Sequence, residues 1–169
     1  MKNKFQIFAE ITKLRITIFV TVTTMFGFIA ATNSISFQIL LPAFGVLLLA
    51  CGSSALNHYQ ERKTDVLMER TKNRPIPSGK ISAKSTIQLS VALVVVGSIL
   101  LFIGSGLLAL SLGLLNLIWY NAVYTPLKKV SALAIIPGSL VGAIPPVVGW
   151  VVGGGNILDP QIILISFFF

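Results

Sequence analysis

The chain has 169 residues, of which 54% are hydrophobic and only 11% are charged. A soluble domain has about a quarter of its residues charged, so this composition excludes an ordinary globular core and predicts a membrane protein. The net charge is +8, and the Lys and Arg residues lie between the apolar runs. Membrane topology explains that placement better than nucleic-acid binding does, and we expect no nucleic-acid partner.

Five apolar runs and the beginning of a sixth follow one another along the chain. Each complete run approaches the roughly 20 residues that a bilayer-spanning helix needs. Only Gly104 to Gly106 separates the third run from the fourth, so we expect a tight helical hairpin there. We predict an all-α, polytopic transmembrane helical bundle in which residues 1–169 form one domain. The runs are 16–33, 38–56, 86–103, 105–123 and 133–152, and the sixth begins near residue 161.

The cationic residues follow a regular alternation. All thirteen Lys and Arg lie in the amino-terminal tail, in the polar segment 58–85, or at Lys128 and Lys129, which are alternate connections between the runs. The positive-inside rule therefore places these connections and the amino terminus in the cytoplasm. The start of the chain has no Arg/Ser-rich leader and no convincing cleavage site. We expect a multi-pass protein of the bacterial inner membrane.

Three oxygen-bearing side chains stand at the end of the second run. Asn57, Glu61 and Asp65 are spaced i, i+4, i+8. If the helix continues through them, each step advances about 6 Å and rotates about 40°, so they share one face. Hard oxygen ligands at this spacing suit Mg²⁺, which keeps waters and shares substrate phosphates. The alternative is a solvated helix end with ordinary i, i+4 contacts to neighbouring cations.

Basic residues at two further places could bind the phosphates of such a substrate. Arg forms bidentate hydrogen bonds with phosphate, and Lys adds point charge. The alternatives are a topological anchor for the loop and an interfacial aromatic belt with a snorkelling lysine for the later pair. We expect Pro126 to end the helix before that lysine. The candidates are Arg70, Lys72, Arg74 and Lys80 within the 58–85 loop, and Tyr124 and Lys128 after the fourth run.

Three motifs together resemble the heme O synthase (protoheme IX farnesyltransferase) branch of the UbiA-type intramembrane prenyltransferases. The likeness runs from about Leu14 to the end of the chain. Glu61 stands where members commonly have Asp. The motifs are Asn57-x-x-x-Glu61-x-x-x-Asp65 followed by Leu67-Met68-Glu69-Arg70-Thr71-Lys72-Asn73-Arg74-Pro75, then Tyr120-Asn121-x-x-Tyr124-Thr125-Pro126-Leu127-Lys128, and Pro137-Gly138 through Pro145-Pro146-x-x-Gly149-Trp150.

The resemblance implies transfer of a farnesyl group from farnesyl diphosphate to a vinyl group of heme B, giving heme O on the way to heme A. Heme B is then a substrate, Mg²⁺ the cofactor, and heme A synthase an expected partner. Asn57, Glu61 and Asp65 would be catalytic metal ligands. The resemblance also implies nine transmembrane helices and a second acidic motif, which this chain lacks. We therefore expect an amino-terminal fragment that is inactive by itself.

Two other functions remain to be weighed. The first, in the same class, is a UbiA-type prenyltransferase whose acceptor is an aromatic acid or a quinone precursor. The second is a non-catalytic membrane subunit or a small transporter, in which the charged loop only sets orientation. A transporter usually carries charge within its spans, and no predicted run here has a charged residue near its centre.

Overall fold

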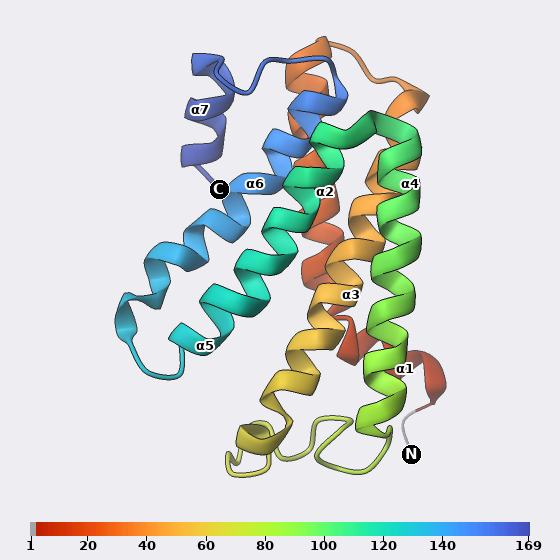
Figure 1. Ribbon diagram of the computed structural model, residues 1–169, viewed down its shortest axis with the longest axis vertical. Coiled ribbons are helices and arrows are strands. Elements are labelled where there is room, and N and C mark those ends of the chain that lie inside the picture. Colours follow the sequence, from red (N-terminus) through yellow and green to blue (C-terminus); the bar gives the residue numbers. More distant parts are fainter. Residues whose placement is uncertain (1–2) are drawn as a thin grey trace.

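The computed structural model describes residues 3–169, and all the regular elements in this range are helical, as predicted (Figure 1). One of the predicted tail charges, Lys2, lies outside the described residues. The helices are α1 (Lys4–Ile11), α2 (Leu14–Thr32), η1 (Phe37–Ile39), α3 (Leu40–Asp65), α4 (Ala83–Ile118), η2 (Trp119–Tyr124), α5 (Thr125–Leu127), η3 (Ala132–Ala134), α6 (Ile135–Val152) and α7 (Pro160–Phe167).

Four helical stretches of the described chain are long and apolar enough to cross a bilayer. They are Leu14–Thr32, Phe37–Asp65, Ala83–Leu127 and Ala132–Val152. The chain is therefore a multi-pass membrane protein. Their outward faces carry exposed large apolar side chains, which is expected of surfaces that contact lipid.

The third of these stretches reverses its direction part-way along. At 45 residues, a straight helix would be about 68 Å long, more than twice the roughly 30 Å hydrocarbon core. Gly106 interrupts it with φ 77° and ψ −169°, a conformation that glycine adopts without steric cost. The two arms on either side of Gly106 run antiparallel (Figure 1). The break lies at the predicted hairpin and confirms it.

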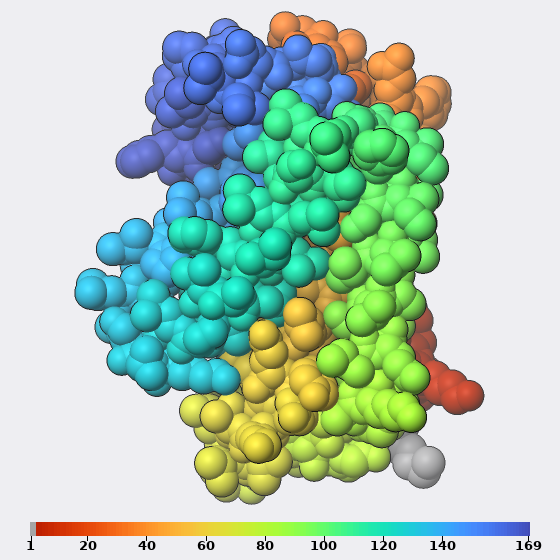
Figure 2. All heavy atoms as spheres, viewed as in Figure 1, coloured from red at the N-terminus to blue at the C-terminus, as the bar shows by residue number. Residues whose placement is uncertain are grey.

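Helix α3 lies at the centre of the bundle. Glycines let the first arm of α4 approach it closely, because a Cβ at Gly45 would lie 2.8 Å from the Leu101 nitrogen and one at Gly97 would lie 2.8 Å from the Gly45 oxygen. In Figure 2 the second half of α3 (amber to yellow) is visible between the two arms of α4. Buried Val46 and Leu49 pack into the same core as Leu101.

Helices α2 and α6 pack together just as closely. A Cβ at Gly149 would overlap the Thr24 carbonyl, and one at Gly27 would overlap the Pro146 carbonyl. Small residues in membrane helices allow this kind of backbone approach. Pro145 and Pro146 both lie inside α6, where neighbouring helices cover the interrupted backbone. The backbones of the two helices therefore lie in direct contact.

One end of the bundle gathers the polar segments. Helix α3 continues to Asp65, so the irregular connection is 66–82, and the polar segment expected over 58–85 begins and ends within helices. Helix α1 is attached to α3 there, since the Ser54 hydroxyl donates a hydrogen bond of 3.1 Å to the Ile11 carbonyl. Helix α1, the 66–82 connection and α5 all lie toward this end (Figure 1).

Candidate functional site

The three oxygen-bearing residues of α3 lie on one buried face, as the spacing predicts. Asn57 has no exposed surface, and Glu61 and Asp65 are 9% and 3% exposed. The helix is continuous through all three, which gives the regular one-turn rise between them. We call these residues the oxygen face. Buried carboxylates require charged partners, so the groups around them determine what this site can bind.

The 66–82 connection supplies the first cation. Arg74 Nη1 lies 2.9 and 3.0 Å from the two carboxylate oxygens of Asp65, and 3.4 Å from Glu61 Oε2. The connection is held in place because the buried Thr71 hydroxyl donates to the Asp65 carbonyl at 3.0 Å, at the end of α3. One guanidinium therefore bridges both carboxylates of the oxygen face.

The segment after α4 supplies the second cation. The helix widens to a π-turn over η2, where the Thr125 N–H bonds to the Tyr120 carbonyl, and Pro126 follows immediately. Proline removes an N–H donor and crowds the preceding turn, so it favours this wider turn. Lys128 comes directly after α5, as predicted, and its Nζ lies 2.7 Å from Glu61 Oε1 and 5.2 Å from the centre of the Tyr124 ring.

The third cation comes from the junction between α1 and α2. Lys13 Nζ donates hydrogen bonds to Asn57 Oδ1 at 2.8 Å and to the Tyr120 hydroxyl at 3.2 Å. The Asn57 amide is fixed on its other side, where Nδ2 donates to Thr125 Oγ1 at 3.0 Å. Burial, and then the charge of nearby Lys128, lower the pKa of the Lys13 ammonium to about 8. That value is above 7, so the group is mostly protonated at neutral pH.

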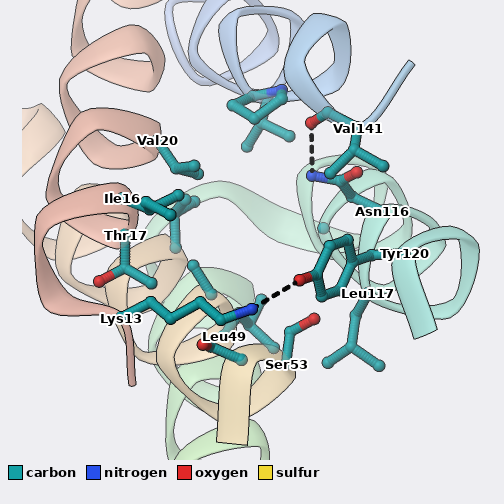
Figure 3. Close-up of a pocket in the computed structure, with 16 residues that line it drawn as sticks. Lys13, Ile16, Thr17, Val20, Leu49, Ser53, Asn116, Leu117, Tyr120 and Val141 are labelled. Atoms are coloured by element: carbon teal, nitrogen blue, oxygen red, sulfur yellow. Dashed lines mark hydrogen bonds between the residues drawn. The ribbon is translucent and has the colours of Figure 1, made fainter. Parts of the chain in front are cut away.

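An apolar cavity begins where these polar groups end. It measures about 120 Å³ and lies between α2, α3, α4 and α6. Its walls are mostly aliphatic, and Lys13 and Tyr120 lie at one end of it (Figure 3). Ser53, Asn116 and Thr17 add uncharged polar groups. The arrangement joins a charged, oxygen-rich pole to an apolar compartment, which suits a ligand with an anionic head and a hydrocarbon chain.

The oxygen face fits a divalent cation of the Mg²⁺ type. Its donors are two carboxylates and one amide oxygen, all of them hard ligands. Among the described residues, no group of three or more His, Cys, Asp or Glu side chains could hold a metal by itself. The remaining coordination positions would therefore belong to water and to substrate oxygens, as is usual for Mg²⁺. Arg74, Lys128 and Lys13 each contact at least one of the three donor side chains.

The sequence and the fold both have known relatives. The model of the UbiA prenyltransferase family matches residues 19–169. The chain belongs to this family. It is 35% identical over 153 residues to a protoheme IX farnesyltransferase of Oleidesulfovibrio alaskensis, covering 90% of this chain and 54% of that protein. A protoheme IX farnesyltransferase of Geobacter sulfurreducens is 46% identical over 122 residues, covering 72% and 45% of the two chains.

A eukaryotic relative and a solved structure show the same likeness. The human mitochondrial protoheme IX farnesyltransferase is 36% identical over 152 residues, covering 89% of this chain and 34% of that protein. A solved structure from work on digeranylgeranylglyceryl phosphate synthase in membranes superposes with a TM-score of 0.84 at 19% identity, over 96% of this chain and 57% of that one. That match supports the UbiA fold. The chain spans about half the length of the bacterial relatives.

The structure gathers some of the predicted site residues of this UbiA protein and not others. Arg74, Tyr124 and Lys128 join the oxygen face. The other three loop cations lie elsewhere. Arg70 is exposed, Lys72 pairs with Glu69 at 2.6 Å, and Lys80 donates to the Asn73 carbonyl at 3.5 Å.

Two residues of the site do not follow from sequence reasoning. Lys13 lies among the tail charges that set topology, and Tyr120 occupies an interfacial aromatic position. Only the repetition of Tyr120, Tyr124 and Lys128 at four-residue steps pointed toward the second of them. His58 is buried next to the oxygen face, and its Nδ1 has no hydrogen-bond partner among the described residues.

Proposed function

We propose that this protein transfers a farnesyl group from farnesyl diphosphate to a vinyl group of heme B, producing heme O for heme A biosynthesis. The main support for the proposal is that the buried oxygen face is in contact with three cations and lies next to an apolar cavity. The names of relatives at 34–46% identity supply the identity of the two substrates. Heme A synthase, which acts on the product, is the expected partner.

The cationic residues act on the diphosphate end of the donor substrate, and the cavity surrounds its farnesyl end. The allylic C–O bond breaks, and the diphosphate leaves with the bonding electrons. Arg74 and Lys128 stabilise that negative charge, which is the largest demand of an ionising step. The vinyl π electrons form the new C–C bond, and water adds to the resulting cation with loss of a proton. The apolar walls of the cavity limit earlier attack by water.

The oxygen face would hold Mg²⁺ through Asn57, Glu61 and Asp65. A bound Mg²⁺ supplies Lewis-acid stabilisation of the departing diphosphate, worth several kcal/mol. The proposed diphosphate contacts are Arg74, Tyr124 and Lys128. Arg70, Lys72 and Lys80 remain proposed contacts that require movement of the 66–82 connection, because they are exposed in the structure.

The proposed setting is the bacterial inner membrane with the amino terminus in the cytoplasm. If the reversal at Gly106 counts as a turn between two spans, the chain crosses the membrane five times and begins a sixth crossing at Pro160. The alternation of Lys and Arg supports this orientation. The oxygen face and the cavity mouth then lie at the cytoplasmic surface, where a soluble diphosphate can leave.

An acceptor competition tests the proposal. Membranes containing a full-length protein that carries this sequence are supplied with farnesyl diphosphate, Mg²⁺, heme B and 4-hydroxybenzoate, and the products are separated by mass. We expect heme O and no prenylated benzoate. Prenylated benzoate alone would favour the aromatic-acceptor alternative. Absence of either product, together with no binding of a non-ionising farnesyl diphosphate analogue, would favour a non-catalytic membrane subunit.

A further inference from the structure

Lys13 lies at the boundary between the oxygen face and the apolar cavity. Among the described residues that line the cavity, it alone carries a charge. Its side chain reaches from the start of α2 across the cavity mouth toward Tyr120 (Figure 3). An occupant whose chain fills the cavity therefore has its first atoms outside the apolar walls beside the Lys13 ammonium.

The partners of Lys13 differ from those of the other two cations. Arg74 and Lys128 each contact a carboxylate of the oxygen face. Both hydrogen-bond acceptors of Lys13 are neutral: the Asn57 amide oxygen and the Tyr120 hydroxyl. A partly buried ammonium that lacks a counter-ion in direct contact keeps much of its desolvation cost. An anion bound beside the Lys13 ammonium would offset that desolvation cost. Of the three cations at the oxygen face, Lys13 therefore gains the most from binding an anion.

The backbone supports this placement. Lys13 adopts the left-handed conformation, with φ 48° and ψ 49°, at the junction between α1 and α2. This conformation costs a non-glycine residue energy, and such strain persists only where surrounding contacts hold it. Thr12 and Ile11 on one side are fully buried, and the Thr12 hydroxyl donates to the Phe8 carbonyl at 2.9 Å. The turn directs the ammonium inward.

We propose that Lys13 binds the phosphate oxygens of the prenyl diphosphate at the cavity mouth, next to the allylic carbon, and so fixes which end of the substrate faces the oxygen face. This inference rests on the proposed function. It gives Lys13 a role separate from the topological one that its position in a cationic tail suggests. The recognised group is a diphosphate joined to an apolar chain, since the ammonium and the cavity act on adjoining parts of one ligand.

Two probes and two variants test this role. The full chain is purified into lipid nanodiscs, and binding is measured for farnesyl thiodiphosphate with Mg²⁺, which does not ionise, and for farnesol, which lacks the phosphates. Lys13→Met keeps the length of the side chain and removes the charge. Arg15→Met is the matched control, because Arg15 is an exposed cation two residues away.

We expect Lys13→Met to weaken farnesyl thiodiphosphate binding by about tenfold or more, the effect of losing a charged hydrogen bond. Farnesol should bind Lys13→Met and the original chain alike, and Arg15→Met should bind both probes normally. Unchanged thiodiphosphate binding in Lys13→Met would overturn the inference, and so would an equal loss for both probes, which indicates a damaged cavity. If the original chain binds neither probe, the proposed function itself fails.

Discussion

Replacing Arg74 by methionine is the most direct test of how the oxygen face is held together. The Asp65 side chain is only 5% exposed, and Arg74 is the cation in contact with it. Methionine keeps much of the apolar stem but leaves the carboxylate of Asp65 without a counter-ion. Breaking a buried pair in this way costs about 3–5 kcal/mol. At about 2–4 °C per kcal/mol for a chain of this size, the melting temperature should fall by about 6–20 °C.

The chain carries its own reporter for this measurement. Cys51 is its single cysteine and is buried, so a thiol-reactive dye becomes fluorescent only as the bundle opens. Melting curves are recorded in nanodiscs without divalent cations for Arg74→Met and for Arg70→Met, the control at an exposed arginine of the same connection. The control should change stability by less than about 0.5 kcal/mol.

Mg²⁺ should then rescue the variant selectively. Once Arg74 is gone, a divalent cation on the oxygen face neutralises Asp65, so the melting temperature of Arg74→Met should rise more with Mg²⁺ than that of the original chain. The double variant Arg74→Met with Asp65→Asn should be more stable than Arg74→Met alone, because no buried charge is left unpaired. A single variant that melts like the original chain in the absence of metal would refute the reasoning.

Three further outcomes are expected. In a cysteine-free background, an impermeant maleimide should label a cysteine at Ser34 on intact cells and one at Ser78 only after permeabilisation; the reverse pattern contradicts the orientation. Gly149→Ala should lower stability by about 1–3 kcal/mol in a melting assay, since its methyl would overlap an α2 carbonyl, and an unchanged melting temperature would disprove that packing. In a full-length protein that carries this sequence, Asp65→Asn should reduce heme O formation, assayed by mass, at least about a hundredfold at equal protein level, and Glu61→Asp should retain most of it. Full activity of Asp65→Asn would exclude it as a metal ligand.

The sequence predicts the backbone of this site well where one physical rule acts alone. Helical periodicity predicts that Asn57, Glu61 and Asp65 share a face, and α3 does continue through them. Glycine at the break between two apolar runs predicts the reversal, and Gly106 does adopt a positive φ there. Both results depend on helix geometry and on the conformational freedom of glycine, which are local properties of the chain.

The sequence does not show which cations reach the oxygen face. Arg70 and Arg74 are one helical turn apart by number and equally suited to phosphate, yet only Arg74 contacts Asp65. The difference comes from the Thr71 hydrogen bond and from the irregular path of the 66–82 connection, which no periodic pattern encodes. Lys13 contacts the oxygen face because α1 packs against α3, and these contacts join residues more than 40 positions apart in the sequence.

One physical cause explains why the sequence identifies neither Arg74 nor Lys13 as the cation that reaches the oxygen face. The positive-inside rule explains the position of every Lys and Arg in the sequence, so a cation that also bound substrate would carry no extra signal there. The structure separates the two roles by contact. Arg74 and Lys128 contact the carboxylates of Glu61 and Asp65, and Lys13 contacts the Asn57 amide. Three positive charges and two negative ones leave a net charge of +1 at the oxygen face. A single net charge is too little to hold a multiply charged diphosphate in a largely apolar setting. A divalent cation on the oxygen face would raise the net charge to +3. This requirement, more than the count of acidic ligands, favours the proposal that the site works with a divalent metal.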